Sequence, residues 1–266
     1  MKDIVENLAA RTKLTTLNQS CWRPKKLHRK ETRSENERHG LTGEAEVRVL
    51  LCDHPALLKV LSVQAAMYVE HDRLTLPSVA KGIKLLPAGR ELEHAKTMGA
   101  MRDLQAKLWP EFIGEYPAIK AHAPARFKSL WDASLWPSVE EVEASWACEL
   151  RYLPCPTEGP WRAWLEESAK SGQAELQDRL VAAARRLIAR CSGDGKLYET
   201  VLSELQDVCD LVPDLDLMED PIIRRAAQEL RPLTTASIDT LRENKAARRD
   251  TAEAAKKIVK MLNLKG

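Results

Sequence analysis

Apolar residues recur at helical spacing through most of this chain, and that spacing limits the fold more than any other feature. Leu104, Leu108 and Phe112, for example, follow one another at intervals of four residues. The sequence contains only eleven Gly and two Phe among 266 residues. Long tracts of Ala, Leu, Glu and Arg favour helices over sheets. We therefore expect a mainly α, multi-helix globular protein.

The same periodicity, read with proline and glycine positions, predicts where the helices lie. Residues 74–88 contain two prolines and a glycine and are expected to form an ordered loop. Pro213 and Pro221 are expected to bracket an acidic loop. The expected helices span residues 2–11, 44–70 with a break after His54, 91–113, 117–131, a short stretch after Pro137, 161–190, 196–211, 221–230 and 238–262.

One segment carries a strand pattern. In residues 146–153, Trp146, Cys148 and Leu150 alternate with the polar Glu149 and Arg151. Residues 13–22 mix Leu with Thr, Asn and Ser and are also expected to be extended. We expect these two segments to pair as a small two-stranded β element, covered by helices, because an isolated two-stranded ribbon is only marginally stable.

The length allows one large domain or two smaller ones. We expect an N-terminal helical region at 1–158, which holds the small sheet and a basic segment, and a C-terminal helical region at 159–266. A single continuous domain is the alternative.

Targeting and redox signals are weak. The N-terminal residues lack the apolar core of a signal peptide, and no uncharged apolar run approaches 18 residues. The six cysteines show no paired spacing. We expect a soluble protein with reduced thiols in the cytoplasm of a host cell.

Metal and cofactor motifs are missing from the sequence. No two histidines are spaced i, i+4, and neither C-x-x-C nor H-E-x-x-H occurs. His71, Asp72, Glu91, Glu93 and His94 are the nearest approach to a ligand set, and we interpret them as solvent-facing polar residues. We expect neither a metal nor a cofactor.

Catalytic motifs are equally weak. The stretch 192–196 resembles a phosphate-binding loop only superficially, because it follows a helix and Leu197 stands where a Ser or Thr is needed. Adjacent carboxylates such as Glu140 and Glu141 point in different directions on a helix. We do not expect an enzyme.

Residues 21–39 form the segment whose composition most suggests an external partner. They contain seven Lys or Arg, with Trp22 near the start. Trp22 is expected either to stack on a base while neighbouring cations bind phosphates, or to anchor a protein surface. The candidate cations are Arg23, Lys25, Lys26, Arg29, Lys30 and Arg33, joined by Arg248, Arg249, Lys256 and Lys257 near the other end of the chain.

Residues 199–220 have the opposite character, with eight acidic residues and no Lys or Arg. Such a block is often a solvated face. The alternative is an acidic partner surface made by Asp207, Asp210, Asp214 and Asp216.

The order of several segments resembles a broad group of bacteriophage-encoded, mostly helical proteins of unknown function. The resemblance is carried by Trp22 with the basic run after it, LLPAG at 85–89, YPAIKAHAPARF at 116–127, SVEEVEASWACELRYLPCP at 138–156, VLSELQDVCDLVPDLDLMEDP at 201–221 and the basic last helix. In that group the basic run tends to continue as a helix, whereas Pro24 interrupts it here. The resemblance implies a phage or mobile-element origin and no particular activity.

Two functional hypotheses follow. The first is a non-enzymatic protein that engages a host nucleic-acid-handling complex, such as a ribonucleoprotein, as a counter-defence inhibitor of the anti-CRISPR kind. The second is a direct, non-sequence-specific nucleic-acid-binding protein of phage replication or recombination. The net charge of +2 favours the first slightly. A homodimer built on the thin apolar stripe of the last helix is a further expectation.

Overall fold

The computed structural model describes residues 4–43, 45–193, 197–235 and 237–263, and its architecture is mainly α, as the sequence predicts. Within the described residues no helix is long and apolar enough to cross a membrane. The helices are α1 (Ile4–Arg11), α2 (Arg29–His39), α3 (Pro55–Leu74), α4 (Glu91–Phe127), α5 (Val139–Ala144), α6 (Trp161–Ser192), α7 (Glu199–Leu215), α8 (Pro221–Thr234), α9 (Ile238–Glu243) and α10 (Lys245–Asn263). The strands are β1 (Thr12–Ser20), β2 (Lys25–Leu27), β3 (Arg48–Leu50), β4 (Leu76–Pro77), β5 (Lys84–Pro87) and β6 (Ala147–Pro154), and short 3-10 turns occupy Ala88–Arg90, Lys128–Leu130 and Ala133–Leu135.

The chain forms two compact units from interleaved segments. Apart from the gaps given above, unit 1 comprises residues 4–16, 72–94 and 151–263, and unit 2 comprises residues 17–71 and 95–150. Strands β1 and β6 and helices α3 and α4 each run from one unit into the other. The sequence-based division after residue 158, with a single continuous domain as its alternative, stays a prediction.

A four-stranded sheet in the order β4-β5-β1-β6 confirms the predicted pairing of residues 13–22 with 146–153. The sheet is larger than expected, because residues 74–88 contribute two strands where a loop was expected. Strand β5 pairs antiparallel with β1, placing Leu86 opposite Lys13. Pro77 and Pro87 lie at strand ends, where a missing N–H is tolerated.

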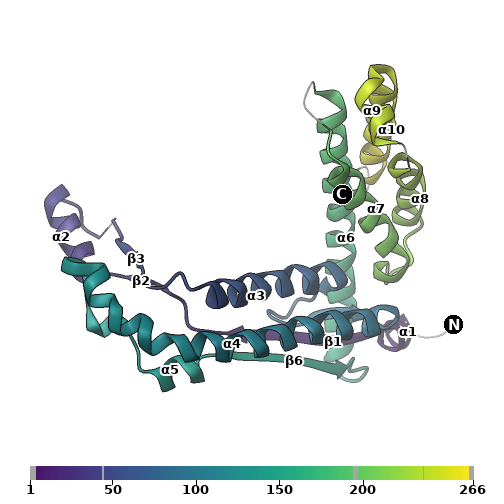
Figure 1. Cartoon of the computed structure of the whole chain (residues 1–266). Coiled ribbons are helices and arrows are strands. Elements are labelled where there is room, and N and C mark those ends of the chain that lie inside the picture. The colour runs from purple at the N-terminus through teal and green to yellow at the C-terminus, as the bar shows by residue number, and fades with distance from the viewer. Residues whose placement is uncertain (1–3, 44, 194–196, 236, 264–266) are drawn as a thin grey trace. The chain divides into compact units, whose positions relative to one another are not determined.

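Unit 1 is organised around α6. Helices α7 and α10 pack along α6, and α8 packs against α7 and α10 (Figure 1). These contacts cover the apolar stripe of α10, in which Ala255 and Ile258 are buried. The stripe is therefore not available to form the expected homodimer, which stays a prediction. The last helix is not continuous as expected, because Asn244 ends α9 and its side chain accepts a hydrogen bond from the Ala247 N–H at 3.0 Å.

Unit 2 is built on an aromatic cluster. The Trp22 ring stacks on Phe112 at a centroid distance of 5.9 Å and meets Tyr116 edge-on at 5.4 Å. Trp136 lies against both Trp22 and Tyr116 at 6.3 Å. Burial raises the pKa of Tyr116 to about 12, and its hydroxyl donates to the Pro137 carbonyl at 3.0 Å. These rings connect the segment before β2 to the middle of α4.

Helix α4 corrects the expectation of two helices separated near Pro117. It continues for 37 residues through Pro110, Pro117 and Pro124. The three prolines are seven residues apart, and all three are solvent-exposed, so they share one outer face of the helix. The carbonyls that lose their N–H donors to proline therefore face water, which satisfies them and allows the helix to continue.

The aromatic cluster gives the first testable prediction. Replacing Trp22 with Ala removes a side chain that is only 5% exposed, and the free energy of unfolding should fall by about 3–5 kcal/mol. Urea denaturation of the purified protein measures this loss. The matched variant Trp161→Ala removes a side chain that is 51% exposed and should cost less than about 1 kcal/mol. Equal losses would contradict the packing described for Trp22.

Candidate functional site

Helix α2 has no apolar face. Its sequence is RKETRSENERH, and Asn36 is its one buried residue. The helix begins after His28, whose Nδ1 accepts the Glu31 N–H at 3.3 Å, and ends at Gly40 with φ of 65°. A helix that is polar all round cannot be held by hydrophobic packing. Its attachment to the rest of unit 2 therefore depends on hydrogen bonds.

Those hydrogen bonds join α2 to the segment that precedes β3. The Asn36 Nδ2 donates to the Ala45 carbonyl at 3.0 Å, and the Asn36 Oδ1 accepts the Ala45 N–H at 3.0 Å. The Thr32 hydroxyl accepts the Val47 N–H at 2.9 Å. The His28 N–H donates to the Val47 carbonyl at 2.8 Å, and its Nε2 contacts the Leu130 carbonyl at 3.2 Å. The side chains of Asn36 and Thr32 therefore make hydrogen bonds to the backbone of residues 45–47 of the kind that a neighbouring strand would make.

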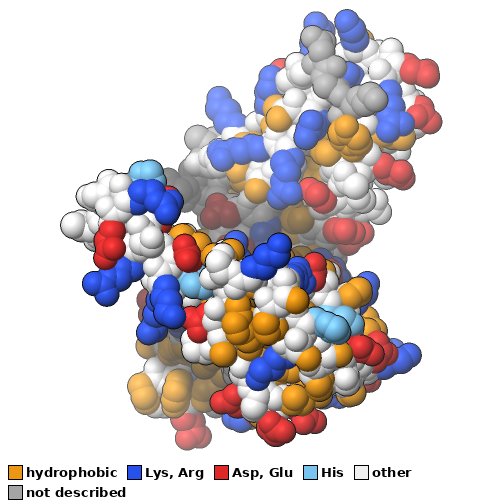
Figure 2. Space-filling model, turned by 60° about the vertical axis from the view of Figure 1, so that its left-hand side comes forward, with side chains coloured by type: hydrophobic (Ala, Val, Ile, Leu, Met, Phe, Trp, Pro, Cys, Tyr) orange, Lys and Arg blue, Asp and Glu red, His pale blue; other side chains and the backbone are white. Residues whose placement is uncertain are grey.

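Strands β2 and β3 complete this structure as an antiparallel two-stranded ribbon, with Lys25 opposite Leu50 and Leu27 opposite Arg48. We call the described residues within 23–50 the basic arm. Figure 2 shows its Lys and Arg side chains interspersed with acidic ones. The basic segment is therefore part strand and part helix: it is extended after Pro24, and a helix begins at Arg29.

Charges in the basic arm are unevenly compensated. Arg33 pairs with Glu37 at 3.0 Å, Arg38 with Glu35 at 2.7 Å, and Arg48 with Glu46 at 2.9 Å. Four cations have no ion-pair or hydrogen-bonded side-chain partner among the residues that the structure describes, namely Lys25, Lys26, Arg29 and Lys30.

The positive charge of the arm lowers the pKa of a nearby acidic residue, Asp132. Hydrogen bonds from Ser134 are the main cause of its lowered pKa, and the charges of Lys30 and His28 lower it further. Asp132 therefore lies within electrostatic range of Lys30, although the two side chains form no ion pair.

Trp22 does not belong to the exposed surface of the arm, which corrects the expectation that its ring stacks on a base or anchors a partner. Its ring is buried in the aromatic cluster, and its Nε1 has no hydrogen-bond partner within the described residues. Arg23 is exposed but donates to the Gln64 Oε1 at 2.7 Å. Trp22 thus anchors the start of the arm in the aromatic core of unit 2.

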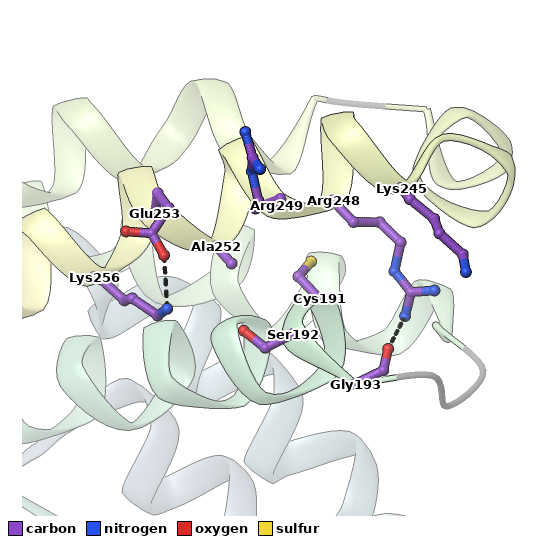
Figure 3. A pocket seen from close by; sticks show the side chains of 9 residues that line it. All are labelled: Cys191, Ser192, Gly193, Lys245, Arg248, Arg249, Ala252, Glu253 and Lys256. Carbon is purple, nitrogen blue, oxygen red and sulfur yellow. Dashed lines mark hydrogen bonds and ion pairs between the residues drawn. The ribbon is translucent and has the colours of Figure 1, made fainter.

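Three of the four cations predicted near the C-terminus, Arg248, Arg249 and Lys256, line a cavity of about 340 Å³ between the end of α6 and α10, and Lys257 does not. Figure 3 shows the Arg248 guanidinium reaching the Gly193 carbonyl, which it contacts at 2.8 Å, while it also donates to the Arg190 carbonyl at 2.7 Å. Arg248 therefore caps the C-terminus of α6. Lys256 pairs with Glu253 at 2.7 Å, and its hydrogen bond is the main cause of the lowered pKa of Glu253, with Lys257 and Arg249 adding to it.

The predicted acidic surface is largely compensated inside unit 1. Asp216 is fully buried and accepts hydrogen bonds from Arg224 Nε at 2.8 Å and from Gln173 Nε2 at 3.1 Å. Asp214 pairs with Arg90 at 2.6 Å, and Asp210 with Arg231 at 2.6 Å. Asp216 is thus a structural residue, which corrects its assignment to a partner surface.

Residues 213–215 also lie in a helix, where the start of a loop was expected. Helix α7 continues through Pro213 to Leu215. Pro213 cannot supply the N–H for the Cys209 carbonyl, and the Arg231 guanidinium donates to that carbonyl at 3.4 Å. Asp207 remains exposed on this helix, with no ion-pair partner among the described residues.

Of the residues considered for metal binding, Asp72 is exposed as expected, but the two histidines are not solvent-facing. His71 and His94 are both buried. The His94 Nδ1 lies 2.9 Å from the Tyr152 hydroxyl, and burial lowers the pKa of His94. No group of three or more His, Cys, Asp or Glu in the described part of the chain is arranged to hold a metal ion.

The cysteine thiols show no sign of activation. Burial raises the pKa of Cys209 to about 12 and that of Cys155 to about 11. Burial also raises the pKa of Cys21, Cys52 and Cys148. These thiols are protonated near neutral pH, the opposite of what a nucleophilic cysteine requires.

No protein-family model, curated protein or solved structure matches the chain. The functional argument therefore rests on the geometry of the site. Sequence reasoning identified the cations of the arm but missed the roles of Thr32 and Asn36. Their signal is the spacing of two short polar residues at i and i+4 in a helix without apolar side chains.

The attachment of α2 gives a second prediction. Replacing Asn36 with Ala removes its hydrogen bonds to Ala45, and the free energy of opening α2 should fall by about 1–3 kcal/mol. Amide hydrogen exchange measures this as faster exchange in residues 29–39. Ser34→Ala, on the exposed face of the same helix, should leave the exchange nearly unchanged. The docking described above is wrong if both variants exchange at the wild-type rate.

The buried His94 gives a third prediction, on pH. Its pKa is lowered in the folded protein, so the unfolded chain binds the proton more readily than the folded one. The stabilising contribution of neutral His94 is present above about pH 6.5, the ordinary pKa, and is lost as pH falls from there through the lowered pKa. Urea denaturation at pH 8 and pH 5 should show this loss. The free energy of unfolding of His94→Gln should depend less on pH. An unchanged dependence would contradict the conclusion that burial lowers the pKa of His94.

Proposed function

We propose that the protein binds the phosphate backbone of nucleic acid through the basic arm and is not an enzyme. The observation that carries this proposal is the set of four cations in the arm without ion-pair partners among the described residues. Lys25 and Lys26 lie on β2, and Arg29 and Lys30 lie in the first turn of α2. Cations free of intramolecular partners are those that phosphate groups can engage without breaking existing bonds.

The contrast with unit 1 supports this choice. There, arginines donate to main-chain carbonyls, as Arg242 does to Leu197 at 3.1 Å and Arg179 does to Thr75 at 3.1 Å. Arg248 caps α6 in the same way. Among the cations predicted near the C-terminus, Arg248 and Lys256 therefore already have partners, which leaves Arg249 and Lys257 without one among the described residues.

Backbone contacts from lysine and arginine give affinity without sequence specificity. We propose this role in phage replication or recombination, in the host cytoplasm, because the sequence resembles phage-encoded proteins. The low net charge of +2 is compatible with a local site, since Asp210 and Asp214 of α7 are compensated by arginines of unit 1.

A second candidate is an inhibitor that binds an acidic surface of a host protein complex, such as a CRISPR ribonucleoprotein. Exposed apolar side chains in the arm favour it: Leu50 is 46% exposed and Leu41 is 37% exposed. A surface that combines cations with exposed leucines suits a protein partner. The acidic partner surface expected of Asp207, Asp210, Asp214 and Asp216 is not part of this proposal, because three of these aspartates have arginine partners.

A fourth prediction tests the proposed function. The quadruple variant of Lys25, Lys26, Arg29 and Lys30 to Ala should lose binding to a labelled single-stranded DNA or RNA. If all four cations contact phosphates, wild-type affinity should fall roughly 50-fold between 50 and 200 mM salt. Fluorescence anisotropy at both salt concentrations measures affinity and slope.

The matched control replaces four exposed lysines outside the arm, Lys81, Lys96, Lys107 and Lys170, with Ala. It changes the net charge equally and should bind as the wild type does. Absence of wild-type binding at 50 mM salt would reject the proposal. Equal loss in both variants would show a diffuse charge effect and would reject the arm as the site.

A further inference from the structure

A pocket of about 480 Å³ lies in unit 2 where the basic arm joins α3 and α4. We propose that this pocket accepts one unstacked base of a single-stranded nucleic acid whose phosphates contact the arm. The inference rests on the proposed function and adds the form of nucleic acid to it. Four of the residues that line the pocket are Leu51, Pro55, Ile119 and Trp136.

The pocket is continuous with the arm. Leu51 directly follows β3, and its N–H donates to the Pro24 carbonyl at 2.8 Å, next to β2. Lys25 lies opposite Leu50 in the β2–β3 ribbon, and Leu50 directly precedes Leu51, which lines the pocket. One strand pair thus joins the first lysine of the arm to the pocket wall, and successive phosphates of a single strand are only about 3.4 Å apart, so a strand bound at Lys25 and Lys26 can bring a base to the pocket.

The walls suit a flat, largely apolar ring. Pro55 is exposed and Ile119 half-buried, and both offer aliphatic surface, whereas Leu51 and Trp136 are almost fully buried and form the floor of the pocket. Bases that leave the stack are commonly held between aromatic and apolar side chains. The volume lies within the range of about 300–1,000 Å³ typical of small-ligand pockets.

The rim supplies polar groups for the edge of a base. Arg126 donates to Asp53 in a bidentate pair, at 2.9 and 3.2 Å, and both side chains are about half exposed. Hydrogen bonding and the charge of Arg126 lower the pKa of Asp53, so this carboxylate stays ionised and can accept hydrogen bonds. The exposed His122 also lines the opening.

Charge complementarity selects the occupant. An apolar side chain of a protein partner would fit the walls equally well, but the adjacent cations, which have no ion-pair partner among the described residues, favour a chain of phosphates. A duplex keeps its bases stacked and cannot deliver one to the pocket without unpairing. Single strands are therefore the form that this combination of arm and pocket recognises.

The experiment compares two labelled 12-nucleotide single strands, one with bases and one abasic with the same phosphates. The purified full chain should bind the abasic strand about tenfold or more weakly, since stacking of a base contributes about 1–3 kcal/mol. Fluorescence anisotropy at 50 mM salt gives both dissociation constants, and their ratio isolates the contribution of the base.

Two matched variants locate that contribution. Ala118 lines the pocket and Ala121 does not, and both are exposed on α4. Ala118→Leu narrows the pocket and should abolish the preference for the strand with bases while leaving the abasic affinity unchanged. Ala121→Leu should behave as the wild type does. Far-UV circular dichroism and thermal melting confirm that both variants are folded.

The outcomes separate the two proposals. Equal wild-type binding of both strands overturns the pocket inference and leaves the phosphate-binding proposal standing. Binding of neither strand overturns both. A preference for bases that persists in Ala118→Leu, or weaker abasic binding by that variant alone, also overturns the pocket as the site of the base.

Discussion

The stacking of Trp22 on Phe112 is the contact on which unit 2 depends. Trp22 comes immediately before the basic arm, and Phe112 lies in the middle of α4, so one pair of rings joins segments 90 residues apart in sequence. Helix α2 of the arm has no apolar face, and the position of the arm relative to α4 follows from this ring packing and from the ribbon β2–β3. Trp22, which the sequence analysis interprets as a surface residue, is therefore a core residue that holds the basic arm in place.

Positive charge is used differently in the two units. In unit 1, arginines donate to carbonyls that helix ends and prolines leave without partners, as Arg231 does for Cys209 and Arg248 does for Arg190. A guanidinium suits this task because it presents several donors in a fixed plane. In the arm, four cations have no ion-pair partner within the part of the chain that the structure describes, and two of them, Lys25 and Lys26, are flexible point charges on a strand. Charge counted along the sequence does not distinguish these two uses.

Much of the architecture could be predicted from sequence, because periodicity and alternation are local properties. The pairing of residues 13–22 with 146–153 and the long helix from Trp161 are confirmed. The errors arise where a non-local contact changes a local rule. Pro213 stays inside α7 because Arg231 supplies a donor, and His94 is buried because Tyr152 lies beside it. The four central cations of the arm could be named from sequence. The burial of Trp22 and Asp216 could not, since it depends on partners far along the chain.

The prolines of α4 have a consequence for the order in which the protein folds. Proline in a helix interior costs on the order of 3 kcal/mol, so a peptide with the sequence of α4 would not hold a helix through Pro110, Pro117 and Pro124 by itself. The second half of α4 becomes helical only when Phe112 and Tyr116 have Trp22 and Trp136 to pack against. During synthesis, that half of the helix therefore waits until Trp136 has left the ribosome, although Trp22 emerged long before.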